Sequence, residues 1–367
     1  MGLINCDYED FYKIIAGKEI VCYGVGKMLQ EAEEEFKNTP IEGQIIKLTD
    51  GNLQHWGSKR KVFGKEIEIL PPQKIFASVN DDTVFLITSG ACMEIIPIIT
   101  SYVKESIQIF IFPFMRSLQD DRNMLKANNK KIAINNTYQK IPKKIHYTWF
   151  SGEELPDNMK KCKESWEKYC RDYEIIEWNR NNYDIEKIPY MKQAIEQKKW
   201  GFAGDYARLD IMYEQGGIYL DLDVELVKSL DELLVNDAYA GFESERHVNF
   251  GSGFGASPKF PLLKEMMKEY EKEVFCKEDG SLNLTASPVY QTRVLNRYGL
   301  REDGTFQCIE GMTIYPFEYL CAQSIFTGNV YQTENTFSIH RFAASWVDSE
   351  ITEKREEKLK LLRNISI

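Results

Sequence analysis

The stretch Gly216-Gly217-Ile218-Tyr219-Leu220-Asp221-Leu222-Asp223-Val224 carries more information than any other part of this chain. A glycine pair followed by alternating apolar and polar residues predicts a strand, in which successive side chains point to opposite faces. The aliphatic residues from Ile218 to Val224 then face a core, and Tyr219, Asp221 and Asp223 share the other face. Two carboxylates on one face of rigid backbone can hold a hard divalent cation and leave positions open for a diphosphate.

The segment before this stretch predicts a helix from Phe202 to Gln215. Apolar and aromatic residues recur there at three- and four-residue spacing, and Gly216-Gly217 ends the helix. Asp205 and Arg208 are three residues apart and therefore share one helical face. Taken alone, this pair has a second interpretation as a surface ion pair, which contributes little to stability.

The composition describes a chain that can bury a sizeable core. It has 367 residues, of which 43% are hydrophobic and 13% aromatic, enough for two domains. No run approaches the roughly 18 apolar residues of a membrane span, and the N-terminus lacks the features of a signal peptide. The eight Cys are scattered without a C-x-x-C pair, which indicates buried, reduced thiols in a cytosolic protein. The net charge of -10 argues against a general nucleic-acid binder.

The N-terminal region alternates between predicted strands and helices, which favours a small parallel α/β domain. Strands are expected within residues 18–23, 44–48, 67–70, 82–88 and 106–112, and helices at 28–36 and up to residue 99. Gly24-x-Gly26 is part of a dinucleotide fingerprint, but Leu29 occupies the third glycine position. Asp50 follows a predicted strand and could bind a ribose, so dinucleotide binding stays open as an alternative. The pattern is similar to degenerate Rossmann-like modules, for which we expect a structural or partner-binding role.

A change in composition divides the chain into two expected domains. Residues 120–131 are polar and charged, so we place the boundary between a Rossmann-like domain at 1–135 and a second α/β domain at 136–367. Residues 351–367 predict a helix of mixed charge, which we expect to pack onto the second domain.

Four elements of the second domain, in this order and spacing, resemble the DXD sugar-transferase group, glycosyltransferase family 32. The central element is the run Ala203-Gly204-Asp205-Tyr206-Ala207-Arg208-Leu209 with the Asp-x-Asp strand after it. Residues 141–150 resemble the family's first strand, and the Trp178-Asn179 region resembles its second. Ser338-Ile339-His340-Arg341 with Ser345-Trp346 resembles its C-terminal element. The match covers roughly residues 138–348 and is also similar to the catalytic domain of the large clostridial glucosylating toxins.

This resemblance implies a GT-A-type α/β domain and a role for each matching residue. The implied catalytic residues are Asp205, Arg208, Asp221 and Asp223, and the implied metal ligands are Asp221, Asp223 and His340. The implied donor-binding residues are Thr148, Trp149, Asp205, Arg208, Tyr219, Asp221, Asn249, Ser345 and Trp346. A carboxylate can accept hydrogen bonds from sugar hydroxyls, and a guanidinium can donate several hydrogen bonds in a fixed planar geometry. Asp205 and Arg208 therefore have the chemistry that binding a donor sugar requires.

Several of these residues keep a structural alternative. Trp149 either stacks on the nucleotide base or packs in the core. His340 is either a metal ligand or a structural histidine. The indole of Trp346 can donate to a diphosphate, with Ser345 in support. His146 lies inside a predicted strand, and we expect it to orient that strand.

The implied function is metal-dependent glycosyl transfer with retention of the anomeric configuration and with Mn²⁺ or Mg²⁺ as cofactor. We expect a nucleotide-sugar donor, UDP-linked by preference and GDP-linked as the alternative. The expected acceptor is a glycan or lipid-linked glycan of bacterial surface-polysaccharide synthesis, in the cytoplasm or at the inner face of the membrane. A toxin-like enzyme that modifies a protein, and an inactive sugar-nucleotide-binding scaffold, stay open. A dinucleotide-dependent oxidoreductase would need the full glycine fingerprint that the chain lacks.

Overall fold

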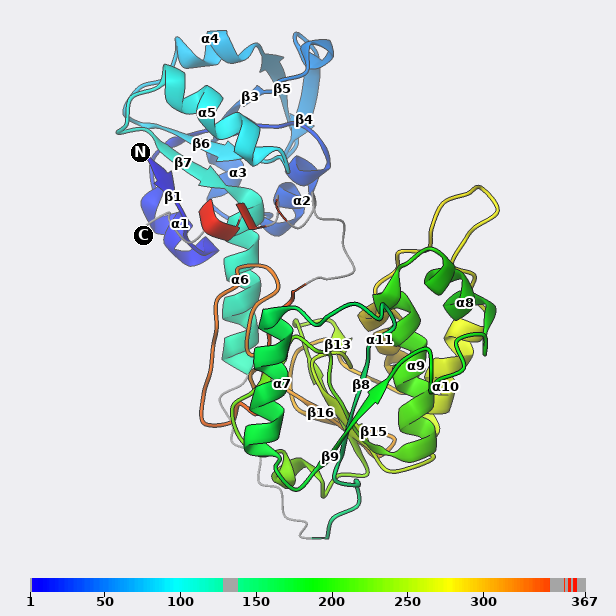
Figure 1. The fold of residues 1–367 in the computed structure, drawn as a ribbon. Coiled ribbons are helices and arrows are strands. Elements are labelled where there is room, and N and C mark those ends of the chain that lie inside the picture. Colours follow the sequence, from blue (N-terminus) through cyan, green and yellow to red (C-terminus); the bar gives the residue numbers. More distant parts are fainter. Residues whose placement is uncertain (1, 128–137, 344–352, 354–355, 358, 362–367) are drawn as a thin grey trace. The chain divides into compact units, whose positions relative to one another are not determined.

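The chain folds into two compact units (Figure 1), which are described separately. The computed structural model describes residues 2–127, 138–343, 353, 356–357 and 359–361. The first unit comprises Met1–Arg122 with Glu353–Ile367, and the second comprises Asn123–Thr352. This division differs from the expected one, which lay near residue 135 and kept the C-terminal residues in the second domain. Leu361 gives the physical reason, because it packs against an apolar cluster of the first unit.

The described residues of the first unit form a seven-stranded sheet with the strand order β1-β7-β6-β2-β3-β5-β4. Its strands are β1 (Leu3–Ile4), β2 (Glu19–Tyr23), β3 (Ile45–Thr49), β4 (Lys59–Val62), β5 (Lys65–Leu70), β6 (Thr83–Ile87) and β7 (Gln108–Ile111). Its helices are α1 (Tyr8–Ile14), α2 (Lys27–Glu35), α3 (Ile41–Gln44), the 3-10 turn η1 (Leu53–His55), α4 (Pro72–Phe76) and α5 (Cys92–Tyr102). Helix α6 (Phe112–Ala127) follows β7 and contains the point at which the two units divide.

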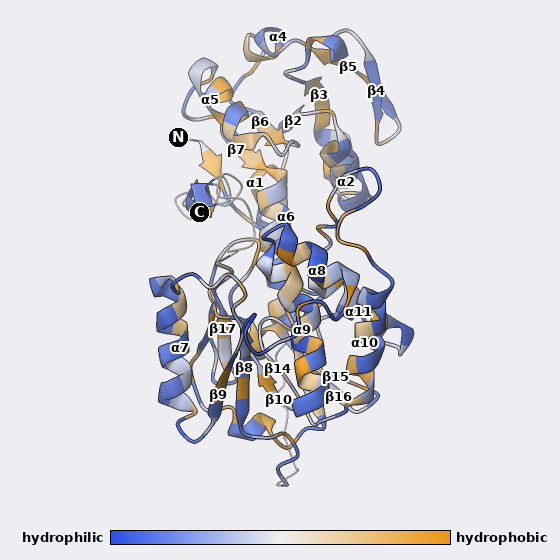
Figure 2. Cartoon of the chain, turned by 45° about the vertical axis from the view of Figure 1, so that its right-hand side comes forward, coloured by the Kyte–Doolittle hydropathy of each residue, from blue (hydrophilic) through white to orange (hydrophobic). Residues whose placement is uncertain are grey.

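Helices cover both faces of this sheet, as the predicted parallel α/β domain requires. Ile20 and Cys22 of β2 pack with residues of α1 and α2, whereas Val21 and Tyr23 pack with residues of α4 and α5. Both faces of a central parallel strand are therefore apolar, which the hydrophobic colour of β6 and β7 in Figure 2 also shows. The antiparallel edge strand β4 was not predicted, because its Lys-Arg-Lys start lacks an apolar face.

The partial glycine fingerprint has a structural explanation in this sheet. Gly24 has a φ of +109°, and a Cβ at this position would lie 2.8 Å from the carbonyl oxygen of Thr88. The Asp50 carboxylate accepts from the backbone N–H groups of Val25 at 2.9 Å and Asn52 at 2.8 Å. Gly24 therefore permits close approach of two loops, and Asp50 holds its own loop, so neither residue by itself indicates a bound dinucleotide.

The second unit is built on a mixed sheet with the order β15-β16-β12-β14-β10-β8-β9, with β13 paired to β12. Its strands are β8 (Lys144–Thr148), β9 (Glu174–Trp178), β10 (Gly217–Tyr219), β12 (Ala238–Phe242), β13 (Val248–Asn249), β14 (Phe254–Ala256), β15 (Gln307–Ile309) and β16 (Met312–Tyr315). A separate two-stranded sheet pairs β11 (Val224–Leu226) with β17 (Ser338–His340). The helices are α7 (Asp157–Tyr169), α8 (Pro189–Glu196), α9 (Trp200–Gln215), the 3-10 turn η2 (Asp231–Leu233), α10 (Pro261–Glu271), α11 (Ser287–Arg297) and α12 (Phe317–Leu320).

Two apolar clusters fill the two sides of this sheet. One holds residues of α8, α9, α10 and α11 together with Tyr219, and the other holds Trp166 of α7 together with Ile218, Leu220, Leu222 and Val224. The predicted separation of Tyr219 from the aliphatic residues is therefore correct. The α/β class is confirmed in both units, and the Asp-x-Asp sequence follows the carboxyl end of β10.

The continuous strand predicted through Asp223 is wrong in one respect. Strand β10 ends at Tyr219 and β11 begins at Val224, and the backbone N–H of Val224 donates to the carbonyl oxygen of Asp221 at 3.0 Å. The chain turns here because β11 leaves the large sheet to pair with β17.

All eight cysteines are free thiols, six of them buried. None of the helices in the described part of the chain has the length and apolar character that crossing a membrane requires.

His146 joins three elements of the second unit and has the orienting role expected for it. The ring is fully buried in β8, its Nδ1 accepts from the indole of Trp178 at 3.0 Å, and its Nε2 lies 2.9 Å from the carbonyl oxygen of Gly216. Because Nδ1 accepts, Nε2 carries the proton and donates. Burial lowers the pKa of His146 to about 4, since a charged ring is poorly solvated there.

We predict that the free energy of unfolding of His146→Gln falls less between pH 7 and pH 4.5 than that of the wild-type protein. The unfolded histidine binds a proton below about pH 6.5, whereas the folded one does so only below about pH 4. Wild-type stability therefore falls as pH drops from about 6.5 to 4, by about 3 kcal/mol from this residue alone. Gln can make the same two hydrogen bonds without titrating. Urea unfolding at pH 7 and pH 4.5 measures the difference, and equal pH slopes in both proteins would contradict the assignment.

Candidate functional site

Several of the predicted site residues lie where the parallel strands β8, β9 and β10 end. Thr148 is the last residue of β8 and pairs with Trp178, the last residue of β9, while Tyr219 ends β10. Carboxyl ends of adjacent parallel strands lie at one edge of a sheet, which is the usual location of ligand sites in open α/β folds. Trp149, Asn179 and Asp221 therefore follow three neighbouring strand ends.

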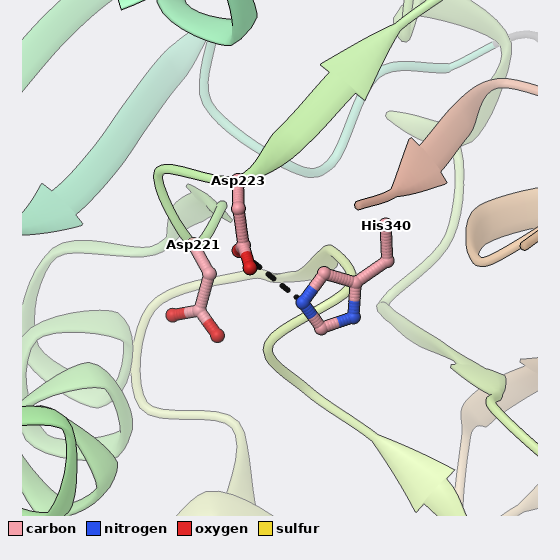
Figure 3. Close-up of side chains that lie close together, drawn as sticks. All are labelled: Asp221, Asp223 and His340. Atoms are coloured by element: carbon pink, nitrogen blue, oxygen red, sulfur yellow. Dashed lines mark ion pairs between the residues drawn. The ribbon is translucent and has the colours of Figure 1, made fainter. Parts of the chain in front are cut away.

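A distant segment of the chain holds Asp223 in place. The Asp223 carbonyl oxygen accepts from the backbone N–H of Arg341 at 2.9 Å, and its carboxylate accepts from the backbone N–H of Ala343 at 2.7 Å. The Nε2 atom of His340 lies 3.2 Å from the other carboxylate oxygen, as the dashed line in Figure 3 shows. The pairing of β11 with β17 sets this geometry, since Val224 is opposite His340.

Asp221, Asp223 and His340 form the candidate metal site (Figure 3). One ligand atom from each residue lies within 4.8 Å of the others. Burial alone would raise the pKa of Asp223, but the neighbouring His340 and the N–H of Ala343 hold that pKa below its ordinary value. The carboxylates conversely raise the pKa of His340 against the effect of burial. Two carboxylates and an imidazole suit Mn²⁺ or a similar divalent ion, which would have to displace a proton from His340.

Asp205 and Arg208 are an internal pair rather than a surface ion pair. They are 7% and 4% exposed, and the Arg208 Nη2 lies 2.7 Å from an Asp205 carboxylate oxygen. Arg208 also lies 3.4 Å from Asp221, so one guanidinium joins the helix α9 to the Asp-x-Asp turn. Burial raises the pKa of Asp205 to about 7, although Arg208 and the hydroxyl of Ser287 favour its ionised form. The Arg208 guanidinium, which lies between the two carboxylates, therefore places hydrogen-bond donors at the edge of the candidate metal site.

Tyr219 and Thr148 connect this pair to the end of β8. The Tyr219 hydroxyl and the Thr148 hydroxyl oxygen are 2.9 Å apart, and the Arg208 guanidinium lies 5.1 Å from the centre of the Tyr219 ring. A Cβ on Gly204 would lie 3.0 Å from the Thr148 hydroxyl oxygen, which explains a small residue there. Tyr219 is almost fully buried, so its ring packs while its hydroxyl stays within the polar cluster.

A pocket of 460 Å³ lies at the ends of β8 and β9. Its lining residues are Trp149, Phe150, Gly152, Glu153, Leu155, Glu177, Asn179, Arg180 and Asn181. The Trp149 indole N–H donates to the carbonyl oxygen of Glu153 at 2.7 Å, which fixes the ring while it lines the pocket. The pocket thus combines two aromatic residues with amide, carboxylate and guanidinium groups, a composition that suits a nucleoside.

Asn249 lies in the cluster but its side chain is occupied by protein groups. Its amide donates to Glu243 at 2.7 Å, and its carbonyl oxygen accepts from the backbone N–H of Gly251 at 2.6 Å. The sequence marks Gly251 only as part of a glycine-rich run, and a Cβ there would overlap Asp221 and lie 2.9 Å from Arg208. The glycine-rich run 249–255 was the available signal for it, whereas Glu243 had none. The expected donor-binding residues Ser345 and Trp346 lie outside the described residues.

Comparison with known families agrees with this geometry. Residues 156–240, which include Asp205, Arg208, Asp221 and Asp223, match the family described as "Glycosyltransferase sugar-binding region containing DXD motif". This part of the chain is thus similar to a DXD-type glycosyltransferase sugar-binding region. The resemblance to the DXD sugar-transferase group inferred from the sequence is therefore confirmed for this part of the second unit.

The relatives of this glycosyltransferase region share only part of their length with the chain. The mannosyl phosphorylinositol ceramide synthase of Saccharomyces cerevisiae is 31% identical over 144 residues, 37% of this chain and 37% of that protein. Inositol phosphoceramide mannosyltransferase 3 of Schizosaccharomyces pombe is 27% identical over 139 residues, 37% of this chain and 38% of that protein. An uncharacterized glycosyltransferase of Acanthamoeba polyphaga mimivirus is 26% identical, over 40% of this chain and 61% of that protein. The chain thus spans 37–38% of the two yeast proteins and 61% of the viral one.

Two solved glycosyltransferases are remotely similar in structure. The PaToxG glycosyltransferase has a TM-score of 0.32 at 16% identity, covering 50% of this chain and 80% of that one. A glycosyltransferase involved in glycosylation of the major capsid of PBCV-1 has a TM-score of 0.34 at 14% identity, covering 59% of this chain and 98% of that one.

We predict that Gly251→Ala lowers the affinity of the site for Mn²⁺ by more than about 10-fold, because the new methyl group would displace the Asp221 carboxylate. Calorimetric titration with Mn²⁺ measures the effect. Gly43→Ala is the matched control, since a Cβ on Gly43 meets no atom within 4 Å. Unchanged Mn²⁺ affinity in Gly251→Ala would show that this close approach does not constrain the site.

We predict that Arg208→Lys lowers turnover of a nucleotide-sugar donor by about 100-fold, as expected for loss of a preorganised donor at a reacting group. A lysine cannot contact Asp205 and Asp221 at once with a planar fork. Donor hydrolysis, with circular dichroism to confirm folding, measures the effect. If the folded fraction instead keeps wild-type specific activity, the pair is purely structural.

Proposed function

We propose that this protein is a metal-dependent glycosyltransferase that uses a nucleotide-sugar donor. The observation that carries the proposal is the meeting of Asp221, Asp223 and His340 beside the buried pair of Asp205 and Arg208. All but His340 lie in the matched sugar-binding region. A site with two carboxylates, an imidazole and an adjacent guanidinium has the groups needed to bind a diphosphate through a cation.

The proposed metal is Mn²⁺, with Mg²⁺ as the alternative, held by Asp221, Asp223 and His340. When bound, it would stabilise the negative charge of a departing diphosphate. The hydrogen bonds from Ala343 and Arg341 keep Asp223 oriented. Asp223 therefore needs little reorganisation to accept the ion, which is the physical advantage of a preorganised site.

The proposed donor position follows the edge of the sheet. The nucleoside would occupy the pocket lined by Trp149 and Asn179, and the diphosphate would lie next to Asp221 and Asp223. The sugar would then contact Asp205 and Arg208, which can accept from and donate to its hydroxyls. Ser345 and Trp346 are proposed to contact the diphosphate on the basis of the family resemblance, which also supports retention of configuration.

The base and the acceptor are proposed more broadly. We propose a UDP-sugar, with a GDP-sugar as the alternative, and a glycan or lipid-linked glycan acceptor. The yeast relatives support a lipid-linked acceptor, since their names refer to ceramide lipids. The eight free cysteines support a reducing compartment, and we propose a cytoplasmic role in bacterial surface-polysaccharide synthesis.

We predict that chelation abolishes donor hydrolysis and that Mn²⁺ restores it. Asp223→Asn should remain folded and lose more than about 100-fold in Mn²⁺ affinity, because an amide is a neutral and weaker ligand. Hydrolysis of a panel of UDP- and GDP-sugars, followed by release of the free nucleotide, measures the activity. Full activity in excess chelator would contradict the metal-dependent mechanism.

The same donors, offered together with protein and glycan acceptors, separate the remaining functions. Binding of a nucleotide sugar without hydrolysis or transfer at any Mn²⁺ concentration would indicate an inactive scaffold. Transfer to proteins but not to glycans would indicate a toxin-like enzyme, the second function that the sequence resemblance left open.

A further inference from the structure

Glu243 is a carboxylic acid beside the candidate metal site that the proposed mechanism does not use. It directly follows β12, and its backbone N–H donates to the carbonyl oxygen of His247 at 2.8 Å. Its side chain is partly buried, and burial raises the pKa of its carboxyl group above the ordinary value while Asn249 and His340 oppose that shift. Among the ion pairs of the described residues, none involves Glu243. A partly buried acid without an ion-pair partner needs another reason for its position.

A continuous series of hydrogen bonds connects Glu243 to Asp221. The Glu243 carboxylate accepts from the Asn249 side-chain amide at 2.7 Å. The Asn249 carbonyl oxygen then accepts from the backbone N–H of Gly251 at 2.6 Å. The Gly251 carbonyl oxygen finally accepts from the backbone N–H of Asp221 at 3.1 Å. The orientation of the Asn249 side-chain amide is fixed on both sides. Its nitrogen must face the Glu243 carboxylate, and its oxygen must face the Gly251 N–H.

The series acts where space is tightest in the site. Gly251 has no room for a side chain because Asp221, Arg208 and Asn249 surround its Cα. A small movement of Gly251 would therefore move Asp221 relative to both Arg208 and Asp223. Groups that hold metal ligands through hydrogen bonds commonly change metal affinity by about 10-fold to 100-fold when removed.

We propose that Glu243 and Asn249 are positioning residues that set the place of Asp221 in the metal site. Glu243 fixes the Asn249 amide, Asn249 fixes the Gly251 loop, and the loop holds the Asp221 backbone. Neither side chain contacts the metal or the donor in this arrangement. Asn249 therefore acts through Gly251 and not as the direct donor-binding residue expected from the sequence. This inference rests on the proposed function only for its effect on metal binding.

Three variants of the full chain test the proposal. Glu243→Ala removes the acceptor for Asn249, whereas Glu243→Gln keeps an oxygen that can accept from it. Glu245→Ala is the matched control, because Glu245 lies in the same loop and outside the series. The first measurement is amide hydrogen exchange of residues 219–224 and 248–253 without any metal. The second is Mn²⁺ affinity by calorimetry.

We expect Glu243→Ala to speed exchange in both segments by roughly 10-fold and to weaken Mn²⁺ binding by about 10-fold to 100-fold. Glu243→Gln and Glu245→Ala should stay within about 3-fold of wild type in both measurements. A change of that size is smaller than the one expected when a positioning group is lost. If Glu243→Ala does not fold, Asn249→Ser breaks the same series at its next member and should give the same result.

Wild-type hydrogen exchange in Glu243→Ala would overturn the proposal. An equally large change of exchange and Mn²⁺ affinity in Glu243→Gln would also overturn it, because the effect would then come from the charge of Glu243. Faster exchange in Glu243→Ala, together with no Mn²⁺ affinity in the wild-type protein, would instead contradict the metal-dependent function and leave the positioning series intact. The two failures are therefore distinguishable.

Discussion

The attachment of Asp223 to the segment around His340 is the contact on which the rest of the site depends. Ala343 donates to the Asp223 carboxylate from 120 residues further along the chain, and β17 pairs with β11 directly after the turn. Closing so long a loop costs entropy, which grows only slowly with loop length. The packing of Leu222 and Val224 beside Trp166 contributes the apolar contacts that offset this cost.

Arg208 makes the second link, because it joins α9 to the turn that carries Asp221. A guanidinium that is 4% exposed is tolerable only with carboxylates nearby, since removing one partner of a buried pair costs about 3–5 kcal/mol. Burial disfavours the charged guanidinium, yet the carboxylate of Asp221 helps to hold the pKa of Arg208 above its ordinary value. The same groups that would bind a donor therefore also stabilise the empty site, and ligand binding must replace contacts that the protein already makes.

The first unit contributes a different kind of information. Its 3-layer arrangement follows from strands such as β2, in which both faces are apolar. The glycine turn and Asp50 are explained by contacts within the unit. The partial dinucleotide fingerprint is thus explained by backbone geometry within the unit. A Rossmann-like fold alone therefore does not assign a ligand to this unit.

Sequence alone was sufficient for elements whose reasons are local. The alternation from Ile218 to Val224 gave the two faces correctly, the helical spacing of Asp205 and Arg208 gave their shared face, and the strand-helix alternation gave the parallel sheet of the first unit. Only the tertiary structure decided that β10 stops at Tyr219, because the pairing of β11 with β17 is a contact between distant segments. It also brought Gly251 next to Asp221 and Glu243 next to Asn249, and no local pattern marks a glycine as the neighbour of a carboxylate 30 residues away. Residue type and spacing thus determined which groups were available, whereas strand pairing and packing decided which of them meet.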